Sequence, residues 1–296
     1  MVRVTVLNGG TSDEREVSLR SGAAVASALK ASGYKVTVLD PKSADITEII
    51  DCDIVFPVLH GAGGEDGAIQ SQLEKRGIPF VGSGSKASAL CFDKWEYRKV
   101  ITAAGLPMPR GDTLEHHEHA THHLAQDLHV LKPIAGGSSI DTFIVRDLKK
   151  IPHDAIAEAF ARYSSMLIEE LIDGTELTVG ILGDKALPII EIVPPEGGEY
   201  DYTNKYFGDT KLLVAPERID SKIQSAAQEL ALQAHRLTGC RDLSRSDIMC
   251  DKTGKLFLLE TNTIPGMTGH SLFPKMAANI GLDMPALCSR LVEMAL

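Results

Sequence analysis

The chain has 296 residues, 44% hydrophobic and 24% charged, so it is long enough for two or three domains with a sizeable core. Its formal net charge of -10 argues against a basic nucleic-acid surface and against attraction to anionic lipid. No apolar stretch approaches the roughly 18–20 residues of a membrane span, and the N-terminus shows no signal-peptide pattern. Five cysteines form no CxxC pair. We therefore expect a cytoplasmic protein with no nucleic acid or membrane as partner.

The first third of the chain alternates predicted strands and helices. Short β-branched runs predict strands at 2–8, 34–40 and 53–60, and a helix is predicted from about Glu14 to Ser32. Segments of helical length separate the strands, which favours a parallel sheet covered on both faces. A further strand-to-helix step ends at "IPFVGSGS", and we place the first domain at 1–93.

The remaining chain is typical of antiparallel sheets. A strand, a Gly-rich loop and a second strand are predicted within 128–147, followed by a helix at 154–163. Strands with tight turns at Asp173-Gly174 and Gly183-Asp184 are predicted within 166–194.

The C-terminal part begins with a polar, Gly-rich loop at 196–210. A long helix at about 220–238, a hairpin and a closing helix are predicted after it. We expect a central α+β domain at 94–180 and a C-terminal domain at 181–296 that carries the loop.

Six of the ten histidines fall within 116–129. His119 and His123 have the i, i+4 spacing of a metal pair on a helix, but no HExxH motif is present. We interpret the segment as the solvated face of a helix, with metal binding as the alternative.

The segment "KPIAGGSS" (132–139) is a candidate phosphate loop. Lys132 ends a predicted strand, and Gly136 to Ser139 form a turn able to present backbone N–H groups to a phosphate. The same residues also suit an ordinary hairpin turn. Neither a GxxxxGK[ST] motif nor a GxGxxG motif is present.

The predicted C-terminal hairpin brings carboxylates together. Side chains two apart on a strand share a face, so Glu260 and Asn262 point the same way. If Thr253-Gly254 is a two-residue turn, Asp247 lies opposite Glu260. A four-residue loop keeps Asp247 on that face, whereas a three-residue loop does not.

Facing carboxylates repel each other. A divalent cation held by Asp247, Glu260 and Asn262 removes this penalty, and oxygen-only ligands suit Mg²⁺. The alternative is that Arg245, Lys255 or solvent neutralises the pair.

Six segments, in order along the chain, resemble signatures of D-alanine–D-alanine ligases, members of the ATP-grasp superfamily. These are "GGTSDEREVSLRSG" (9–22), "HGAGGEDGAIQ" (60–70), "KPIAGGSS" (132–139), "EELIDGTELTVGIL" (169–182), "YDYTNKY" (200–206) and "LLETNTIPGMTGHSL" (258–272).

The resemblance implies an ATP-grasp fold of the α/β and α+β classes, with an N-terminal parallel-sheet (pre-ATP-grasp) domain. It implies ATP-dependent joining of two D-alanine molecules through an acyl phosphate and a tetrahedral intermediate, for peptidoglycan precursors. It also implies a homodimer. Another ATP-grasp ligase, such as a D-alanine–D-lactate or D-alanine–D-serine enzyme, is the nearest alternative. A non-catalytic nucleotide-binding protein and a periplasmic-type binding protein are the others.

The resemblance also assigns a nucleotide site. Lys94 and Lys132 would bind the ATP phosphates, Glu169 and Leu171 the adenine, and Glu176 the ribose hydroxyls.

Two Mg²⁺ ions, or Mn²⁺ in their place, would be bound by Asp247, Glu260 and Asn262. Arg245 would stabilise charge on the intermediate.

The amino-acid sites follow in the same way. Glu14 would take the ammonium of the first substrate, with His60 nearby. Ser271 and the backbone of Leu272 would bind the carboxylate of the second. Without the resemblance, these residues also suit a helix-start charge, a strand-end histidine and a capping loop.

The loop 196–210 has the polar, Gly-bounded composition of a mobile lid. By resemblance, Lys205 is a nucleotide ligand, and Tyr206 would hydrogen-bond with Ser138 and Glu14 to close the site. A tyrosine at this position favours the dipeptide product.

Three places depart from the family pattern. The family has Gly-Trp-Gly where this chain has Asp242-Leu243-Ser244, glycine is common where it has Asp141, and lysine is common where it has Glu170. Asp141 and Glu170 add negative charge near the expected ATP. Either these charges point away or local cations offset them.

Overall fold

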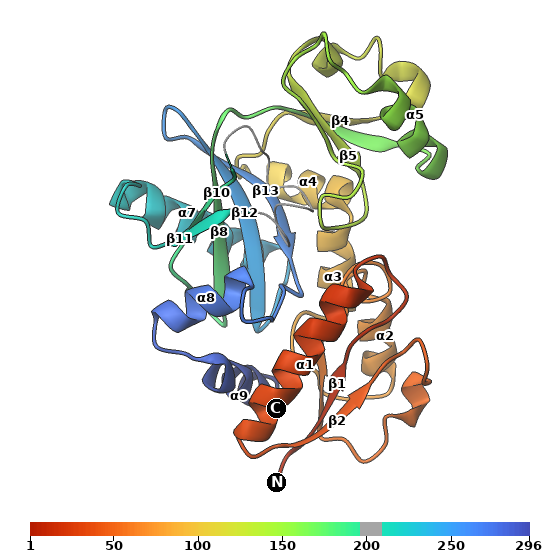
Figure 1. Cartoon of the computed structure of the whole chain (residues 1–296), viewed down its shortest axis with the longest axis vertical. Coiled ribbons are helices and arrows are strands. Elements are labelled where there is room, and N and C mark those ends of the chain that lie inside the picture. Colours follow the sequence, from red (N-terminus) through yellow and green to blue (C-terminus); the bar gives the residue numbers. More distant parts are fainter. Residues whose placement is uncertain (196–208) are drawn as a thin grey trace.

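A computed structural model describes residues 1–195 and 209–296 of the chain. The chain forms three units; in Figure 1 the second lies at the upper end, the third lies at the left between the other two, and the first unit forms the lower end. Its elements are β1 (Arg3–Leu7), α1 (Arg15–Ala31), β2 (Lys35–Leu39), the 3-10 helix η1 (Ile46–Glu48), β3 (Ile54–Pro57), α2 (Ala68–Lys75) and α3 (Ser85–Phe92).

The parallel sheet predicted for this unit is confirmed, with strand order β2-β1-β3. Two expectations are wrong. The segment between β2 and β3 is described throughout and contains the 3-10 helix η1 instead of an α-helix. The strand predicted at 78–81 is reduced to one bridge between Phe80 and Val55, because Pro79 has no N–H to donate to a ladder.

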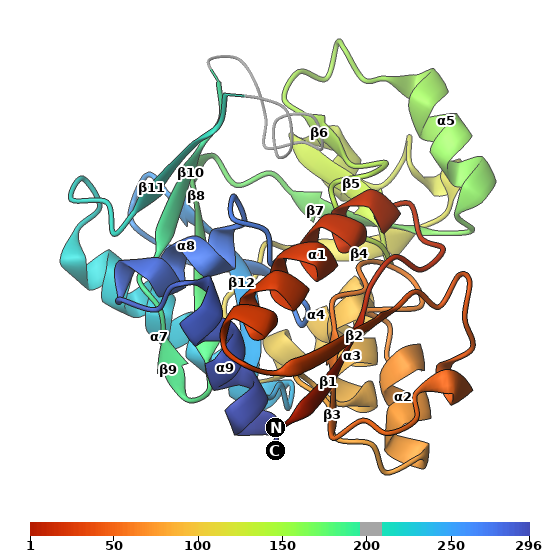
Figure 2. The ribbon, with the colours of Figure 1, turned by 60° about the horizontal axis from the view of Figure 1, so that its bottom comes forward.

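The second unit, at the upper end in Figure 1, is a four-stranded antiparallel sheet with order β4-β7-β5-β6. Helix α5 lies beside it (Figure 2). The elements are β4 (Gly111–Leu114), η2 (His116–Glu118), η3 (His123–Gln126), β5 (His129–Pro133), β6 (Phe143–Val145), α5 (His153–Arg162) and β7 (Met166–Glu170).

The His-rich segment is not the helix that we expected. It forms the two short 3-10 helices η2 and η3, so the i, i+4 relation of His119 and His123 has no structural basis. His119 is buried instead, with its Nε2 3.4 Å from Nε2 of His129. Burial lowers the pKa of His119 to about 4. Among the described residues, no group of three His, Cys, Asp or Glu is arranged to hold a metal ion.

The third unit is a six-stranded sheet with order β11-β10-β8-β12-β13, in which β9 pairs with β8. Helix α4 (Lys94–Ala103), between the first two units in the sequence, lies between the third unit's sheet and the second unit in Figure 1. The elements of the third unit are β8 (Gly174–Leu182), β9 (Lys185–Ala186), β10 (Ile190–Val193), β11 (Lys211–Val214), α7 (Ser221–Leu237), β12 (Leu243–Asp251), β13 (Leu256–Asn262), α8 (Leu272–Asn279) and α9 (Met284–Ala295).

The turn predicted at Asp173-Gly174 does not close a hairpin. Strand β7 pairs with β4 and β5, whereas β8 pairs with β10 and β12, so the chain crosses there from one sheet to the other. The domain boundary predicted between residues 180 and 181 falls inside β8. The turn at Gly183-Asp184 does join two paired strands, β8 and β9.

The β12–β13 hairpin has the predicted pairing of Asp247 with Glu260, but its loop length differs from the prediction. Its loop has three residues, 252–254, because the N–H of Asp251 donates to the carbonyl oxygen of Lys255 at 2.9 Å. Gly254 ends this loop at φ 88°, the usual geometry of a three-residue hairpin. That register would place Asp247 opposite Leu259. A β-bulge shifts the register by one residue between Asp247 and Ile248, so Asp247 pairs with Glu260.

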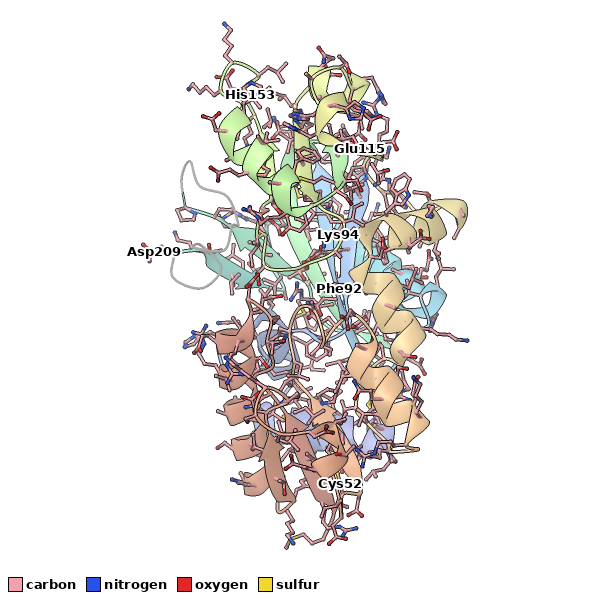
Figure 3. The ribbon with its side chains drawn as sticks, turned by 90° about the vertical axis from the view of Figure 1, so that its right-hand side faces the viewer. Cys52, Phe92, Lys94, Glu115, His153 and Asp209 are labelled. Carbon is pink, nitrogen blue, oxygen red and sulfur yellow. The ribbon has the colours of Figure 1, made fainter. Side chains whose placement is uncertain are left out.

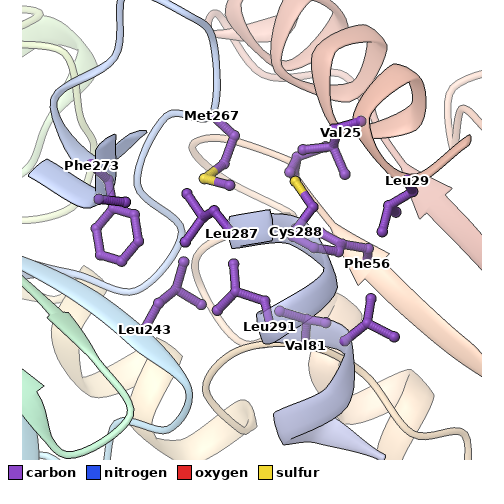
Figure 4. Close-up of a cluster of buried hydrophobic side chains, with 14 of the residues drawn as sticks. Val25, Leu29, Phe56, Val81, Leu243, Met267, Phe273, Leu287, Cys288 and Leu291 are labelled. Carbon is purple, nitrogen blue, oxygen red and sulfur yellow. The ribbon is translucent and has the colours of Figure 1, made fainter. Parts of the chain in front are cut away.

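One hydrophobic cluster joins the first unit to the third (Figure 4). Val25 and Leu29 of α1 and Phe56 of β3 belong to it, together with Leu287 and Leu291 of α9. The two chain ends accordingly lie close together in both Figure 1 and Figure 2. The first and third units share a core and fix each other's position. No described helix is long and apolar enough to cross a membrane.

Leu291→Ala should lower the free energy of unfolding by about 2–5 kcal/mol, because it opens a cavity in this shared cluster. Leu296→Ala, at a position that is 62% exposed, should change the same quantity by about 0.5 kcal/mol or less. Urea unfolding followed by circular dichroism measures both. Similar losses for the two variants would show that α9 does not contribute to the core.

Candidate active site

Two neighbouring cavities of about 470 Å³ and about 330 Å³ lie where the three units meet. The larger, which we call the first cavity, lies between the second and third units, and the smaller second cavity lies against the first unit. They share Lys94, the turn 136–138 and Glu260 in their linings. Figure 3 labels Lys94 midway along the molecule, between Cys52 at one end and His153 at the other.

The residues that the resemblance assigned to a nucleotide separate from those assigned to amino acids. The first cavity is lined by Lys94, Lys132, Glu169, Leu171, Glu176, Asp247 and Glu260. The second is lined by Glu14, His60, Ser138, Arg245, Asn262, Ser271 and Leu272. Lys205 and Tyr206 lie outside the described residues.

A buried carboxylate holds two cations beside the first cavity. Glu169, on β7, is 2% exposed. Its Oε2 lies 2.6 Å from Nζ of Lys132, and its Oε1 accepts a hydrogen bond from NH1 of Arg98 at 2.9 Å. This fixes the Lys132 ammonium toward the cavity and leaves one excess positive charge among the three groups.

Lys94 connects the two cavities. Its Nζ donates to the carbonyl oxygen of Gly136 at 2.6 Å and lies 3.7 Å from Oε2 of Glu260. Asp93 caps α4 by accepting from the N–H groups of Trp95 and Glu96, which fixes Lys94 at the first helical position. Burial lowers the pKa of Lys94, and the charge of Glu260 opposes that shift.

Asp247 and Glu260 face each other as predicted, and each has a cationic neighbour. The guanidinium of Arg245 donates to both Asp247 oxygens, at 3.0 Å and 2.8 Å. Thr178 Oγ1 also donates to Asp247, at 2.6 Å. The pairing by Arg245 that we considered as an alternative to metal is therefore present. Lys255 lies instead over the ring of Phe257, 4.6 Å from its centroid.

These donors nevertheless suit a hard cation. Asp247 and Glu260 both line the first cavity and offer carboxylate oxygens on one face of the hairpin. Asn262 is more constrained, because its Oδ1 accepts from the N–H of Ile264 at 2.7 Å. An amide oxygen has two lone pairs, so Asn262 can accept a second contact.

The loop after Lys132 closes a hairpin, and its backbone geometry is compatible with the phosphate loop that remains a prediction. Strands β5 and β6 pair antiparallel, so residues 134–142 do close a hairpin. Ser138, Ser139 and Asp141 have φ between 53° and 56°, a left-handed geometry that is uncommon for non-glycine residues. Successive backbone N–H groups in such a turn conformation can converge and form an anion-binding concavity.

Glu14 and Ser138, 124 positions apart in the sequence, are hydrogen-bonded, with the hydroxyl donating to Oε1 of Glu14. Two glycines allow this approach. A Cβ on Gly137 would lie 2.8 Å from Oε2 of Glu14, and a Cβ on Gly61 would lie 2.9 Å from it. Glu14 occupies the N-cap position of α1, makes no side-chain capping hydrogen bond there and is buried.

His60 is held on both ring nitrogens. Its Nε2 lies 3.1 Å from Oγ of Ser21, and its Nδ1 lies 3.6 Å from Oε1 of Glu65. Glu65 is buried and also lines the second cavity. Sequence reasoning missed Glu65, although it lies five residues after His60 in the same quoted segment.

Ser271 and Leu272 stand at the N-terminal end of α8. Ser271 is the N-cap residue, and its Oγ accepts from the N–H of Thr268 at 3.0 Å. The Leu272 side chain belongs to the shared hydrophobic cluster, so only its backbone is available to the second cavity. A helix N-terminus offers N–H groups suited to a carboxylate.

Sequence reasoning also missed the apolar walls of the first cavity. They include Val130, Ile144, Ile172, Met249 and Leu259. Strand alternation could have identified Met249, because it follows Asp247 by two positions on β12 and shares its face. The same holds for Val130, two positions before Lys132 on β5. Ile144 and Ile172 come from segments whose relative placement only the fold reveals, and Leu259 reaches the cavity at the bulge.

Comparisons with known proteins identify the family. A family model for the D-ala D-ala ligase C-terminus matches residues 100–293, and one for the D-ala D-ala ligase N-terminus matches residues 38–83. The chain belongs to the D-alanine–D-alanine ligase family.

Relatives in this family match along almost the whole chain. The D-alanine–D-alanine ligase of Xanthobacter autotrophicus is 45% identical over 98% of this chain and 97% of its own length. That of Methylobacterium radiotolerans is 44% identical over 98% of this chain and 97% of its own.

Solved structures share the ATP-grasp fold. The Bacillus anthracis D-alanine–D-alanine ligase complexed with ATP superimposes with a TM-score of 0.85 at 29% identity, covering 100% of this chain and 97% of that one. The VanG D-Ala:D-Ser ligase of Enterococcus faecalis gives 0.83 at 28% identity, covering 100% and 99%. Fold alone therefore does not separate the two acceptors.

The two extra acidic residues of this family member are both neutralised locally. Asp141 accepts from NH2 of Arg162 at 2.6 Å and from the hydroxyl of Tyr163 at 2.9 Å. Glu170 accepts from the Nε of Arg110 at 2.6 Å and from its backbone N–H at 2.7 Å. Local cations offset both charges, as one of our two alternatives required.

The unusual Asp242-Leu243-Ser244 segment, at the start of β12, connects the third unit to the first by a hydrogen bond and by packing. Asp242 has φ 61°, and its Oδ2 accepts from the N–H of Gly82 in the first unit at 2.8 Å. Leu243 packs in the shared hydrophobic cluster (Figure 4). Ser244 is buried with its Oγ 2.7 Å from Nδ1 of His235 on α7. The segment anchors the start of β12 and so the position of Arg245.

His235, which contacts this segment, makes the stability of the fold sensitive to acid. Burial lowers its pKa to about 4, against about 6.5 in an unfolded chain. The unfolded chain thus binds more protons between these values, and stability falls as the pH drops through that window. His235→Gln keeps an amide beside Ser244 but cannot titrate. Its free energy of unfolding should fall less than that of the wild type between about pH 7 and about pH 5. Urea unfolding of both proteins at the two pH values measures this, and an equal loss of stability in the variant and the wild type would contradict it.

Proposed function

We propose that this protein joins two D-alanine molecules to D-alanyl-D-alanine at the expense of ATP, supplying peptidoglycan precursors. The observation that carries the proposal is the boundary between the two cavities. A lysine, a left-handed Gly/Ser loop and a carboxylate line both, which is what transfer of a phosphoryl group from a ligand in one cavity to a ligand in the other requires.

ATP would occupy the first cavity. Its apolar walls suit a flat base, and Glu176, which lines the same cavity, would bind the ribose hydroxyls. Leu171 donates its N–H to the carbonyl oxygen of Leu128 at 3.1 Å, so it would meet adenine through its side chain. The phosphates would lie between Lys94, Lys132 and the N–H groups of the loop 136–139.

Asp247, Glu260 and Asn262 would hold two Mg²⁺ ions, or Mn²⁺, beside these phosphates. When bound, such ions neutralise charge on a phosphoryl group as it is transferred. Arg245 and Lys94 lie beside the two carboxylates, at 2.8 Å from Asp247 and 3.7 Å from Glu260. Both cations also line the second cavity, where they would contact the substrates.

The first D-alanine would bind in the second cavity, its ammonium at Glu14 with His60 nearby. Its carboxylate would then face the boundary, where Lys94 and the loop N–H groups favour attack on the γ-phosphorus. The second D-alanine would bind with its carboxylate at the N-terminal end of α8, near Ser271 and Leu272. Arg245 would stabilise the oxyanion as the amine attacks the acyl phosphate.

The segment 196–210 would cover the site, because an acyl phosphate must be shielded from water. Lys205 would contact the nucleotide, and Tyr206 would reach Ser138 and Glu14. The Ser138–Glu14 hydrogen bond supports this, because it brings both expected partners of Tyr206 to one place.

D-serine or D-lactate as the second substrate is the alternative, and the similarity to a D-Ala:D-Ser ligase structure favours testing it. The 42–45% identical relatives carry the D-alanine–D-alanine name, so we give D-alanine precedence. We also propose a cytoplasmic homodimer, supported by the family resemblance, which light scattering of the purified protein would test.

The direct test supplies purified protein with Mg-ATP and D-alanine. Phosphate should be released in step with a product whose mass is that of the dipeptide, and L-alanine should give neither. D-serine and D-lactate in competition identify the acceptor by the mass of the product. A pH range further separates D-lactate from the two amino acids, since an attacking amine must be deprotonated and a hydroxyl acceptor is neutral throughout. No phosphate release with D-alanine would reject the proposal.

Glu260→Gln should retain nucleotide binding but lose turnover by about 100-fold or more, because charge stabilisation worth several kcal/mol is removed. Calorimetry with ATP and the phosphate-release assay separate the two effects. Glu158→Gln, at an exposed carboxylate on α5, is the matched control and should behave as wild type. Near-normal turnover of Glu260→Gln would mean that the metal assignment is wrong.

A further inference from the structure

Two cysteines from distant parts of the chain meet at the edge of the second cavity. Cys91 lies on α3, is buried and lines that cavity, and Cys240 follows α7 and is partly exposed. Their Sγ atoms are 3.8 Å apart, a van der Waals contact about 1.8 Å longer than the S–S bond of a disulfide. Cys52, by contrast, donates to the carbonyl oxygen of Ile54 at 2.9 Å.

The two thiols differ in acidity. Hydrogen bonds from Cys91 first, and from Thr238 and Ser83, lower the pKa of Cys240 to about 7. Oγ1 of Thr238 lies 3.2 Å from the Cys240 sulfur. The contact with Cys240 and burial raise the pKa of Cys91. Cys240 therefore supplies the nucleophilic thiolate, and Cys91 holds its proton.

We propose that Cys91 and Cys240 form an oxidisable dithiol, a modification site that a peroxide converts to a disulfide and a thiol reductant restores. We assign the first reaction with the oxidant to Cys240, the more exposed residue of the pair, and Cys91 is in contact to resolve it.

The chemistry balances in two steps. The Cys240 thiolate attacks one oxygen of the peroxide, the O–O bond breaks, and the products are a sulfenic acid and an alcohol or water. This removes the negative charge beside Cys91, so its thiol loses a proton more easily. The Cys91 sulfur then attacks the Cys240 sulfur, the S–O bond breaks, and water leaves. Two thiols are oxidised and one peroxide is reduced.

The bond would constrain both sides of the candidate active site. Cys91 precedes Lys94 by three residues, and Cys240 precedes Arg245 by five. A disulfide would tie the end of α3 to the start of β12, drawing together the segments that position these two cations. We expect slower turnover in the oxidised protein. This consequence rests on the proposed function, whereas formation of the bond does not.

The full-length protein treated with hydrogen peroxide provides the test. Two of the five thiols should be lost, and digestion without reductant should give one peptide pair linked through Cys91 and Cys240. Dithiothreitol should restore both thiols and the original rate of phosphate release. A linked pair in a protein that has no ligase activity would reject the proposed function and leave this inference standing.

Variants identify each role. Cys91→Ala removes the main hydrogen bond to Cys240, so it should react more slowly with peroxide and stop at a sulfenic acid on Cys240, which dimedone traps. Cys240→Ala should leave Cys91 reduced. Cys52→Ala, the control, should still give the linked pair. Thiol loss in the wild type without that pair, or a linkage that involves Cys52, would overturn the inference.

Discussion

The site depends on two carboxylates, Asp247 and Glu260, that face each other across adjacent strands. Like charges in this position repel, so the fold must bring cations to them. Arg245 binds Asp247 through two hydrogen bonds, and Lys94 approaches Glu260 at 3.7 Å. Lys94 also holds the carbonyl oxygen of Gly136. One electrostatic requirement thereby links β12, β13, the start of α4 and the Gly/Ser loop.

Sequence alternation predicted this arrangement, but not the way in which the chain achieves it. The expected two-residue turn is a three-residue loop, which alone would have turned Asp247 away from Glu260. The bulge that leaves Leu259 unpaired restores the facing pair. A bulge depends on what packs against both strands, so the residues of one strand do not reveal it. The prediction of facing side chains was confirmed, although the turn on which it rested was wrong.

Local patterns likewise located most strands and helices, because periodicity is a local property. They failed where the partner is distant. Strands β7 and β8 look like a hairpin in the sequence, yet each has its partners in a different sheet. His119 looks like the partner of His123 and instead contacts His129. The Glu14–Ser138 contact spans 124 positions and follows from how the first unit meets the second. The family resemblance brought Glu14 and Ser138 together only as partners of Tyr206, and alternation did not relate them at all.

An acidic chain that binds a polyphosphate must separate its own negative charges from the ligand. In this chain, individual carboxylates are paired with neighbouring cations. Glu169 lies between Arg98 and Lys132, so it orients a lysine without cancelling the positive charge of the group. Asp141 and Glu170, where the family has neutral or basic residues, are each bound by an arginine. Among the described residues, the first cavity is lined by six carboxylates and four basic side chains. Arg98, Arg110 and Arg245 lie outside that lining and each bind one of the six carboxylates, which brings the balance to seven positive and six negative charges. The net charge of -10 therefore does not carry over to the cavity, and Lys94 and Lys132 in its lining can contact the anion that we propose it holds.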